Sequence, residues 1–295
     1  MPRFAKMPRL LIVGCGDVGL RCLPLLRGRW RVAALTSSPQ RFAELRATGA
    51  TPILGNLDDA ASLKRLGGWA DAVLHLAPPQ NLGSTDLRMR NLLRSLAASP
   101  PARIVYASTT GVYGDCGGAF FDETRPVAPN TDRARRRVDA ETQLRAYAVE
   151  HHATVTLLRV PGIYASDRVG GHPRERLLKG SPVLRAEDDV FTNHIHANDL
   201  AHACVLALYR GRPQRVLHVC DDSELRMGDY FDLAADLCGL PRPPRISRAE
   251  AASLMSPMQL SFMSESRRLD NRRLKTELRL RLRYPLPKNG LIADV

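Results

Sequence analysis

The sequence is short of lysine, of aromatic residues and of long apolar segments. Only five of the 43 basic residues among the 295 are lysine, and aromatic residues make up 5%. No apolar run approaches the ~20 residues that a helix needs to cross a bilayer, which argues against a membrane-spanning helix. The basic first eight residues contain no apolar segment of the kind found in signal peptides. We therefore expect a cytoplasmic protein with no membrane partner.

Metal-binding and disulfide patterns are also missing. The six cysteines form no Cys-x-x-Cys pair and no cluster with histidine at zinc-ligand spacing. Two histidine pairs, His151-His152 and His194 with His196, have no carboxylate at metal-ligand spacing. We therefore expect reduced, mostly buried cysteines and no metal site.

The net charge is strongly positive, at +13, with an isoelectric point near 10.0. An excess of this kind is typical of nucleic-acid-binding proteins. Here, however, the arginines are spread along the chain and no nucleic-acid-binding motif accompanies them. We expect no nucleic-acid partner. Attraction of anionic nucleotides or sugar phosphates, and a simple compositional bias towards arginine, both stay open.

One motif near the N-terminus is informative. Gly14-Cys15-Gly16-Asp17-Val18-Gly19 follows the apolar residues 10–13 and opens a helical pattern. Its glycines permit a tight turn and let backbone N–H groups approach a diphosphate, whose charge the helix dipole favours. The motif lies in a strand–helix–strand unit of ~30 residues, which distinguishes it from a chance cluster of glycines. The sequence therefore predicts dinucleotide binding; the alternative is a tight turn that binds nothing.

Short β-branched runs alternate with helical patterns through the first half of the chain. This alternation indicates an α/β fold of Rossmann type, with a doubly wound parallel sheet covered by helices on both faces. In such sheets a ligand binds beyond the carboxyl ends of the strands. Expected strands span residues 9–13, 31–35, 51–54, 72–76, 103–107 and 154–159, and expected helices span 18–27, 39–48, 59–66, 85–98 and 132–150.

The pattern loosens after about residue 160. We expect an NAD(P)-binding Rossmann domain at 8–160 and, at 161–295, a mixed region that completes the sheet and forms a small substrate-binding lobe. Asp199 begins a helical run and is expected to cap it. The leucines of the arginine-rich segment 267–283 have helical spacing and predict an amphipathic cap helix, with an interaction surface as the alternative. Further elements are expected as helices at 198–209 and 227–237, a strand at 216–220 and a surface loop at 240–246.

These landmarks together resemble the extended short-chain dehydrogenase/reductases, the NAD-dependent epimerase/dehydratase family. The resemblance covers roughly residues 8–285 and rests on the order and spacing of several motifs, each loose by itself. The motifs are residues 14–19 (GCGDVG), 55–57 (GNL), 75–77 (HLA), 108–114 (STTGVYG), 159–164 (RVPGIY) and 194–199 (HIHAND).

The resemblance implies roles for the residues at matching positions. Thr109 matches the catalytic Ser/Thr of the family, whose hydroxyl polarises the substrate oxygen. Asn56 stands where relatives usually have an aspartate beside the adenine, so an acceptor is kept and a charge is lost. The implied cofactor contacts are Gly14, Gly16, Asp17, Val18 and Gly19 at the diphosphate, Asn56 and Leu57 at the adenine, Leu76 and Ala77 along the cofactor, and Pro161 and Ile163 beside the nicotinamide.

The end of the second expected strand bears on the choice between NAD and NADP. A carboxylate about 20 residues after the glycines would bind the ribose hydroxyls and repel a 2′-phosphate. Here the strand ends at Thr36 and is followed by Ser37, Ser38 and Arg41, without a carboxylate. Small hydroxyls and a nearby cation suit a phosphate, so we expect NADP as the preferred cofactor and NAD as the alternative. Arg41 could equally be a surface residue of an ordinary helix.

The chain departs from the family at the catalytic Tyr-x-x-x-Lys motif. The family places Tyr-x-x-x-Lys at the start of the long helix after the fifth strand, where the tyrosine transfers a proton and the lysine lowers its pKa. Counted back from Ala140-Glu141, these positions hold Arg133 and Arg137. An arginine has a pKa above ~12 and cannot relay a proton at neutral pH. Arg137 keeps donors for a ribose hydroxyl, and Arg133 can clamp a carboxylate or phosphate; a solvated helix face is the alternative.

Two tyrosines follow other expected strands. Tyr113 and Tyr164 belong to loops at the carboxyl ends of strands, so each is a candidate for proton transfer or for packing in the substrate wall. We take Thr109, Tyr113, Arg133 and Arg137 as the candidate catalytic residues. The departure resembles an atypical subgroup of the family, which keeps the cofactor glycines and lacks the Tyr/Lys pair.

The resemblance then implies an NAD(P)-dependent oxidoreductase or epimerase-like protein. It would act by hydride transfer on a small substrate, anionic or nucleotide-sugar-like, with the proton carried by a tyrosine or by water. The missing Tyr/Lys pair supports the alternative, a non-catalytic NAD(P)-binding sensor or scaffold. Family members are often dimers through their long helices, so a homodimer is expected unless the arginines of 133–137 disfavour that packing.

Overall fold

A computed structural model describes residues 7–255 and 257–292, and a seven-stranded parallel sheet forms its centre. The strand order is β11-β7-β5-β4-β1-β2-β3, so the chain reverses its direction of travel across the sheet between β1 and β4. Ligands of doubly wound sheets bind at such a switch point. The Rossmann-type fold expected from the sequence is confirmed. The strands are β1 (Arg9–Val13), β2 (Arg31–Thr36), β3 (Thr51–Leu54), β4 (Ala72–His75), β5 (Arg103–Thr109), β7 (Thr154–Val160) and β11 (Arg215–His218).

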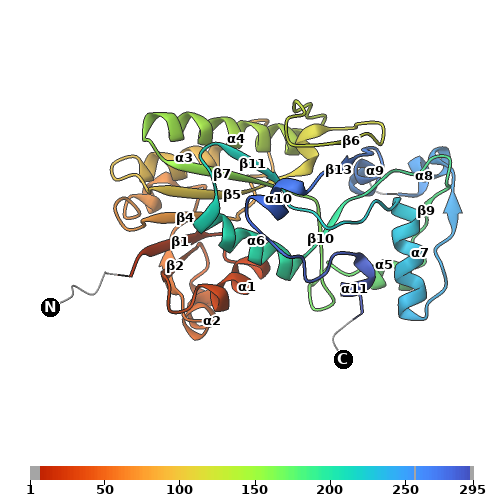
Figure 1. Cartoon of the computed structure of the whole chain (residues 1–295), viewed down its shortest axis with the longest axis horizontal. Helices are drawn as coiled ribbons and strands as arrows, with labels where there is room; N and C mark the ends of the chain where they lie inside the picture. The colour runs from red at the N-terminus through yellow and green to blue at the C-terminus, as the bar shows by residue number, and fades with distance from the viewer. Residues whose placement is uncertain (1–6, 256, 293–295) are drawn as a thin grey trace.

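Alternate residues of β1 supply two separate cores, because successive side chains of a strand point to opposite faces. Leu10 and Ile12 pack with α1 (Asp17–Leu26) and α6 (Ala197–Arg210), whereas Leu11 and Val13 pack with α3 (Leu87–Leu96) and α4 (Asp132–Glu150). Figure 1 shows α3 and α4 on one side of the sheet and α1 and α6 on the other. The remaining helical turns of this half are η1 (Pro39–Arg41), α2 (Phe42–Ala47), η2 (Ala60–Leu63) and η3 (Thr110–Tyr113).

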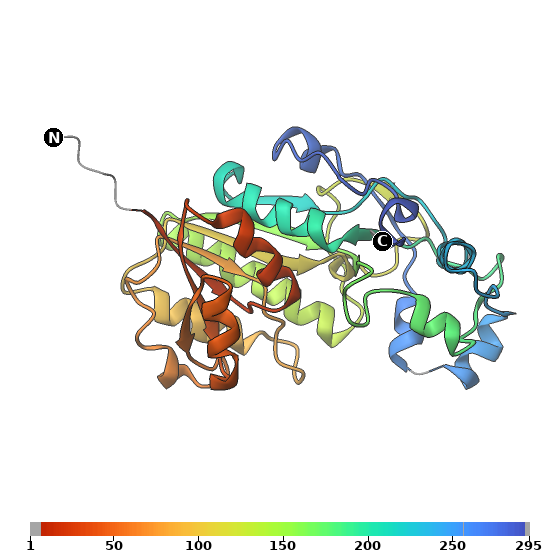
Figure 2. The same ribbon diagram turned by 90° about the horizontal axis from the view of Figure 1, so that it is seen from below.

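Most of the later elements gather at one end of the long axis, away from β1, β2 and β3, whereas α10 lies near the middle of the molecule, beside β11 (Figures 1 and 2). Three pairs of short parallel strands tie this part together: β8 with β10, β9 with β12, and β6 with β13. Its elements are β6 (Phe120–Phe121), β8 (Gly162–Tyr164), α5 (Arg174–Leu178), β9 (Val183–Leu184), β10 (His194–His196), α7 (Met227–Cys238), β12 (Arg245–Ile246), α8 (Arg248–Leu254), α9 (Pro257–Phe262), β13 (Arg268–Leu269), α10 (Arg272–Thr276) and α11 (Pro287–Gly290).

The helix expected at 267–283 is wrong. The segment begins with β13, and its helical part is limited to α10. Arg279 has a positive φ of 54°, a left-handed conformation that a continuous helix does not contain. Leu274, Leu278 and Leu280 are nevertheless buried in the core of α1 and α6. The leucine spacing therefore reflected burial rather than helical structure.

Two further expectations need correction. Asp199 does not cap α6, because the cap is His196, whose side chain accepts a hydrogen bond from the Asn198 amide. The buried Asp199 carboxylate instead accepts hydrogen bonds from the amides of Arg283 and Tyr284, both at 2.9 Å. The loop expected at 240–246 ends in β12.

Among the described residues, no helix is both long and apolar enough to cross a membrane.

Candidate functional site

Three adjoining cavities form one crevice beyond the carboxyl ends of the central strands. The glycine-loop cavity, of about 430 Å³, lies between residues 13–16 and the ends of β2, β3 and β4. The Thr109 cavity, of about 230 Å³, shares Leu76 with it. The arginine cavity, of about 520 Å³, shares Thr109, Arg137, Pro161 and Ile163 with the Thr109 cavity and lies against the C-terminal part of the chain.

The glycine loop requires glycine at position 14. Gly14 has a φ of +85°, and a Cβ atom there would lie 2.4 Å from the backbone nitrogen of Ala77. A side chain is excluded by both the conformation and the close approach of the segment that follows β4. Cys15 is buried beside it, and burial raises the pKa of its thiol to about 11, so the loop carries no negative charge of its own there.

The N-terminus of α1 faces the same cavity. Gly16 caps this helix without any side-chain hydrogen bond, and a Cβ atom at Gly16 would meet no atom within 4 Å. The first amides of a helix are donors without intrahelical partners, and the helix dipole favours an anion beside them. Gly16 lines the cavity, so this end of α1 is suited to bind a phosphate group.

The predicted residues of the glycine motif separate into two groups. Gly14 and Gly16 line the glycine-loop cavity, and Val18 lines the Thr109 cavity. Gly19 lies behind the loop, where an added Cβ would contact the Cys15 sulfur at 3.2 Å. The Asp17 carboxylate is held by Arg21 and Arg168 and lines none of the three cavities.

Seven other expected cofactor residues also line the glycine-loop cavity. These are Thr36, Ser37, Arg41, Asn56, Leu57, Leu76 and Ala77. Arg41 is partly exposed and forms two hydrogen bonds with Glu44, at 2.9 and 3.1 Å. Thr36 Oγ1 accepts a hydrogen bond from the Ser38 amide, and Asn56 Oδ1 accepts one from the Asp58 amide. No carboxylate is among the described residues that line this cavity.

Thr109 and two arginines of α4 come together where the Thr109 and arginine cavities meet. Thr109 Oγ1 accepts a hydrogen bond from the Gly111 amide at 3.3 Å. Arg137 donates through Nη1 to the Tyr106 hydroxyl at 2.8 Å and to the Ala107 carbonyl at 3.0 Å. Arg133 lies one turn earlier on α4 and also lines the arginine cavity. Three of the four candidate catalytic residues therefore share one wall.

Tyr113 does not join them. It is 1% exposed and lines none of the three cavities. Its hydroxyl lies 2.6 Å from His218 Nε2 and accepts a hydrogen bond from Arg159 Nη1 at 2.6 Å, while Arg159 also pairs with buried Glu141. Burial raises the pKa of Tyr113 to about 12. The structure thus gives Tyr113 a place in a buried network behind the site.

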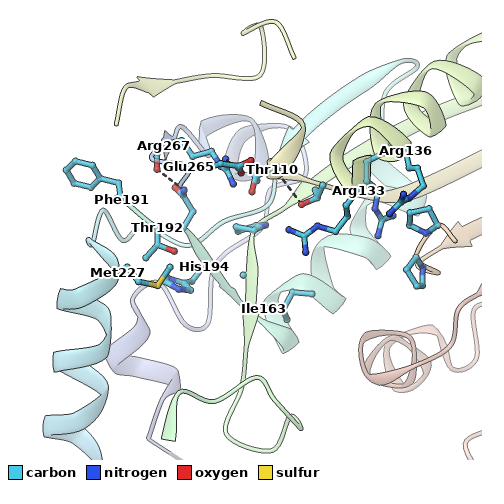
Figure 3. Close-up of a pocket in the computed structure, with 18 of the residues that line it drawn as sticks. Thr110, Arg133, Arg136, Ile163, Phe191, Thr192, His194, Met227, Glu265 and Arg267 are labelled. Carbon is cyan, nitrogen blue, oxygen red and sulfur yellow. Dashed lines mark hydrogen bonds and ion pairs between the residues drawn. The ribbon is translucent and has the colours of Figure 1, made fainter. Parts of the chain in front are cut away.

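Most residues of the arginine cavity were not expected from the sequence. Figure 3 shows Arg133 and Arg136 on one side of Ile163, and Thr192, His194 and Met227 on the other. Glu265, the carboxylate among the described lining residues, accepts a hydrogen bond from Arg267 at 2.7 Å. The unexpected lining residues include Gln80, Arg136, Arg168, Arg176, Phe191, Thr192, His194, Met227, Glu265 and Arg267.

These residues gave little local signal. The histidine pattern 194–196 was visible in the sequence, and so were the arginines, but nothing in their spacing indicated that they share a cavity. Their proximity results from pairings between distant segments, such as β8 with β10 and β6 with β13. Among the described residues, no group of three or more metal-ligating side chains is suited to hold a metal ion.

Known proteins are similar to this chain over nearly its whole length. Protein YeeZ of Escherichia coli (strain K12) is 26% identical over 291 residues, which cover 95% of this chain and 98% of that protein. A functionally unknown conserved protein from Silicibacter pomeroyi DSS is 31% identical, with a TM-score of 0.79 and 96% of both chains covered. UDP-glucuronic acid 4-epimerase from Bacillus cereus, solved in complex with NAD, shares the fold at 15% identity, with a TM-score of 0.74 and 96% of both chains covered.

The profile of the NAD dependent epimerase/dehydratase family matches residues 10–220, a stretch that runs from β1 through β11. This stretch contains the glycine loop, Thr109, Arg133 and Arg137. The match covers more than half of the chain and agrees with the observed topology. The chain therefore belongs to the NAD dependent epimerase/dehydratase family.

Proposed function

We propose that the protein is an NAD(P)-dependent oxidoreductase or epimerase-like enzyme whose substrate is small and anionic or nucleotide-sugar-like. The observation that carries this proposal is the continuity of the crevice. It leads from the glycine loop, past Thr109, to a cavity with Arg133 in its wall. A cofactor in the first part and a substrate in the last would meet at Thr109.

The residues present fit a dinucleotide. Gly14 lets the backbone approach Ala77 closely, and the uncapped start of α1 offers amide donors for a diphosphate. In this proposal the diphosphate lies against Gly14, Gly16 and Val18. The adenine lies beside Asn56 and Leu57, and the nicotinamide lies beside Pro161 and Ile163. A bound nicotinamide dinucleotide supplies the ability to accept or release a hydride. Residues 8–160 would carry the cofactor, and residues 161–295 most of the substrate wall.

We favour NADP over NAD because of the charges around the end of β2. Thr36, Ser37 and Arg41 line the cavity there, and a 2′-phosphate would find hydroxyl donors and one guanidinium. The Arg41–Glu44 pair does not oppose this, because an exposed ion pair of this kind contributes little and is readily exchanged for a phosphate. The Bacillus cereus relative was solved with NAD, so NAD is the competing cofactor in any binding test.

On the substrate side, each residue has one task. The Thr109 hydroxyl would donate to the substrate oxygen and polarise it. Arg133 would orient a carboxylate or phosphate through paired hydrogen bonds. Arg137 would stay on the floor of the site, since its guanidinium already binds Tyr106 and Ala107. Because arginine does not release its proton and Tyr113 is enclosed, a water molecule would carry the proton.

A second function is favoured by the same replacement. Arg133 and Arg137 occupy the positions at which the family keeps its proton-transferring tyrosine and its lysine. A protein that binds NAD(P) through an intact glycine loop and has lost this pair would serve as a sensor or scaffold. The two functions share cofactor binding and differ in turnover.

Fluorescence titration with NADPH, followed by turnover assays, tests both functions. We expect saturable binding and slow turnover of at least one member of a panel of nucleotide sugars, sugar phosphates and hydroxy acids. Saturable binding without turnover across the panel would favour the sensor. If neither NADPH nor NADH binds, the proposal and its alternative are both wrong.

A further inference from the structure

Buried polar atoms without partners concentrate around the arginine cavity. Arg136 Nε, Arg176 Nε and Nη2, and His194 Nδ1 are all buried and have no hydrogen-bond partner among the described residues. All three residues line this one cavity. Buried polar groups in folded proteins are nearly always hydrogen-bonded, so a cluster of exceptions in the walls of one cavity indicates that these walls lack acceptors.

The positive charge of Arg176 is less well compensated than the charges of Arg168 and Arg267, which also line this cavity. Arg168 pairs with Asp17, and Arg267 pairs with Glu265. Arg176 has no such carboxylate: its guanidinium stacks on the ring of Phe231 at 4.4 Å, and burial lowers its pKa. Holding the Nε and Nη2 atoms of a guanidinium away from water without an anion is unfavourable. An arginine kept in this position is therefore suited to an external anion.

His194 lies on the same surface as Arg176. It stacks on Tyr230, with ring centroids 3.9 Å apart, while Arg176 stacks on the neighbouring Phe231 of α7. Burial lowers the pKa of His194 to about 3, so the imidazole is neutral at physiological pH. A neutral imidazole can donate one hydrogen bond without adding a second buried charge. Arg176 and His194 thus offer a cation and a neutral polar group to the same cavity, each packed against a neighbouring aromatic ring of α7.

This face is distinct from the wall that α4 provides. Figure 3 shows His194 beside Thr192 and Met227, across Ile163 from Arg133 and Arg136. The cavity between them has a volume of about 520 Å³, which is within the range of small-molecule sites. Arg176 lines the same space.

We infer that Arg176 and His194 form a second oxyanion subsite, opposite the one at Arg133, so that the cavity takes a ligand with two separated acid groups. Each acid group is a carboxylate or a phosphate, since both accept the paired hydrogen bonds that guanidinium donates. The inference rests on the proposed function for its placement beside a cofactor, and it adds a requirement on the substrate: one acid group at each wall.

Calorimetric titration of the full-length protein, with NADPH present to fill the glycine loop, tests this inference. The probes are inorganic phosphate, with one acid group, fructose 1,6-bisphosphate, with two phosphates, and glutarate, with two carboxylates. The variants are Arg176→Met and the matched control Arg174→Met, which removes an exposed arginine from the same helix α5. Because both variants lose one positive charge from one helix, a difference between them is specific to the cavity.

We expect at least one two-headed probe to bind the wild type about tenfold more tightly than inorganic phosphate, since two anchored groups share one binding event. The probe that binds identifies the acid group. Arg176→Met should remove this advantage, whereas Arg174→Met should change affinity by less than about twofold. The inference is overturned if both variants behave alike, or if neither two-headed probe binds the wild type more tightly than phosphate does.

Thermal unfolding without ligand separates a binding role from a structural one. Methionine keeps contact with Phe231 and removes an uncompensated charge, so Arg176→Met should melt at or above the wild-type temperature. A lower melting temperature would show that Arg176 supports the fold. Titration of the wild type with NADPH and with NADH separates the two proposals. If neither coenzyme binds, the proposed function is wrong, while an Arg176-dependent response to the probes would still establish the subsite.

Discussion

The two ends of the crevice differ in what faces the ligand. The glycine-loop cavity is shaped by backbone and small side chains, among them Gly14, Gly16 and Ala77. The arginine cavity is shaped by long charged side chains from segments as far apart as α4 and residue 267. Backbone amides are fixed by the fold, whereas side chains change with one substitution. The first end is therefore suited to a ligand common to many relatives, and the second to a ligand particular to this chain.

The sharpest way to break this comparison is a charge in the glycine loop. Gly16→Asp should reduce NADPH affinity by about 100-fold or more, because a carboxylate would repel the diphosphate. The fold should survive, since the space at Gly16 is open and aspartate is a good N-cap for α1. Fluorescence titration measures the affinity and thermal unfolding the stability. Gly16→Ala is the control, and an unchanged affinity in Gly16→Asp would contradict the role given to the loop.

A buried histidine at the end of β4 gives the cofactor half a pH response. Burial lowers the pKa of His75 to about 3, so its ring stays neutral in the folded state at pH 5 and is protonated in the unfolded chain. The unfolded state then binds more protons, and stability falls as the pH drops below about 6.5. Between pH 7 and pH 5 the wild type should lose about 2 kcal/mol more than His75→Phe. Denaturant unfolding at both pH values measures this, with exposed His152→Gln expected to follow the wild type.

Replacing Tyr113 tests whether the network behind the site has a catalytic part. Tyr113→Phe leaves Arg159 Nη1 without its acceptor and should cost about 1–3 kcal/mol of stability. Cofactor affinity and any turnover should stay unchanged. Tyr209→Phe serves as the control: it removes the hydroxyl of an exposed tyrosine, which accepts a hydrogen bond from Trp30 Nε1, and should cost about 1 kcal/mol or less because water can replace the lost acceptor. A large loss of turnover in Tyr113→Phe at unchanged stability would make Tyr113 a proton relay after all.

The smallest expected effect concerns the choice between the two cofactors. Arg41→Ala should weaken NADPH about tenfold and leave NADH nearly unchanged, because only NADPH carries the 2′-phosphate. Competitive titration of the two coenzymes measures the ratio. Arg46→Ala removes an exposed cation from the adjacent helix α2 and should not alter the ratio of NADPH to NADH affinity. Equal losses for both coenzymes in Arg41→Ala would remove the basis for NADP.

The predictability of the site follows the range of its contacts. The glycine loop, the end of β2 and residues 56–57 were expected because their roles depend on short segments that follow a strand. Arg176, His194 and Glu265 were missed because only long-range pairing brings them beside Thr109.

The errors in the fold have the same origin. Asp199 looks like a helix cap within its own segment, yet its partners are the amides of Arg283 and Tyr284, far along the chain. The leucines of 267–283 have a helical period, but the chain turns through a left-handed residue at Arg279 and still buries them. The local patterns predicted correctly which side chains are buried. Contacts with distant parts of the chain determine the backbone conformation and the hydrogen-bond partners of these residues.

The hold of Arg137 on Tyr106 and Ala107 constrains any attempt to rebuild the family's usual chemistry here. A lysine at 137 would replace the planar guanidinium with a single ammonium group. The fully buried Tyr106 hydroxyl and a cofactor ribose would then compete for the hydrogen bonds of that ammonium. Replacing Arg133 with tyrosine and Arg137 with lysine would thus restore the Tyr-x-x-x-Lys sequence without the geometry that the motif requires. Such a variant would also need a new partner for the Tyr106 hydroxyl, so the family's usual arrangement would require at least three coordinated substitutions here.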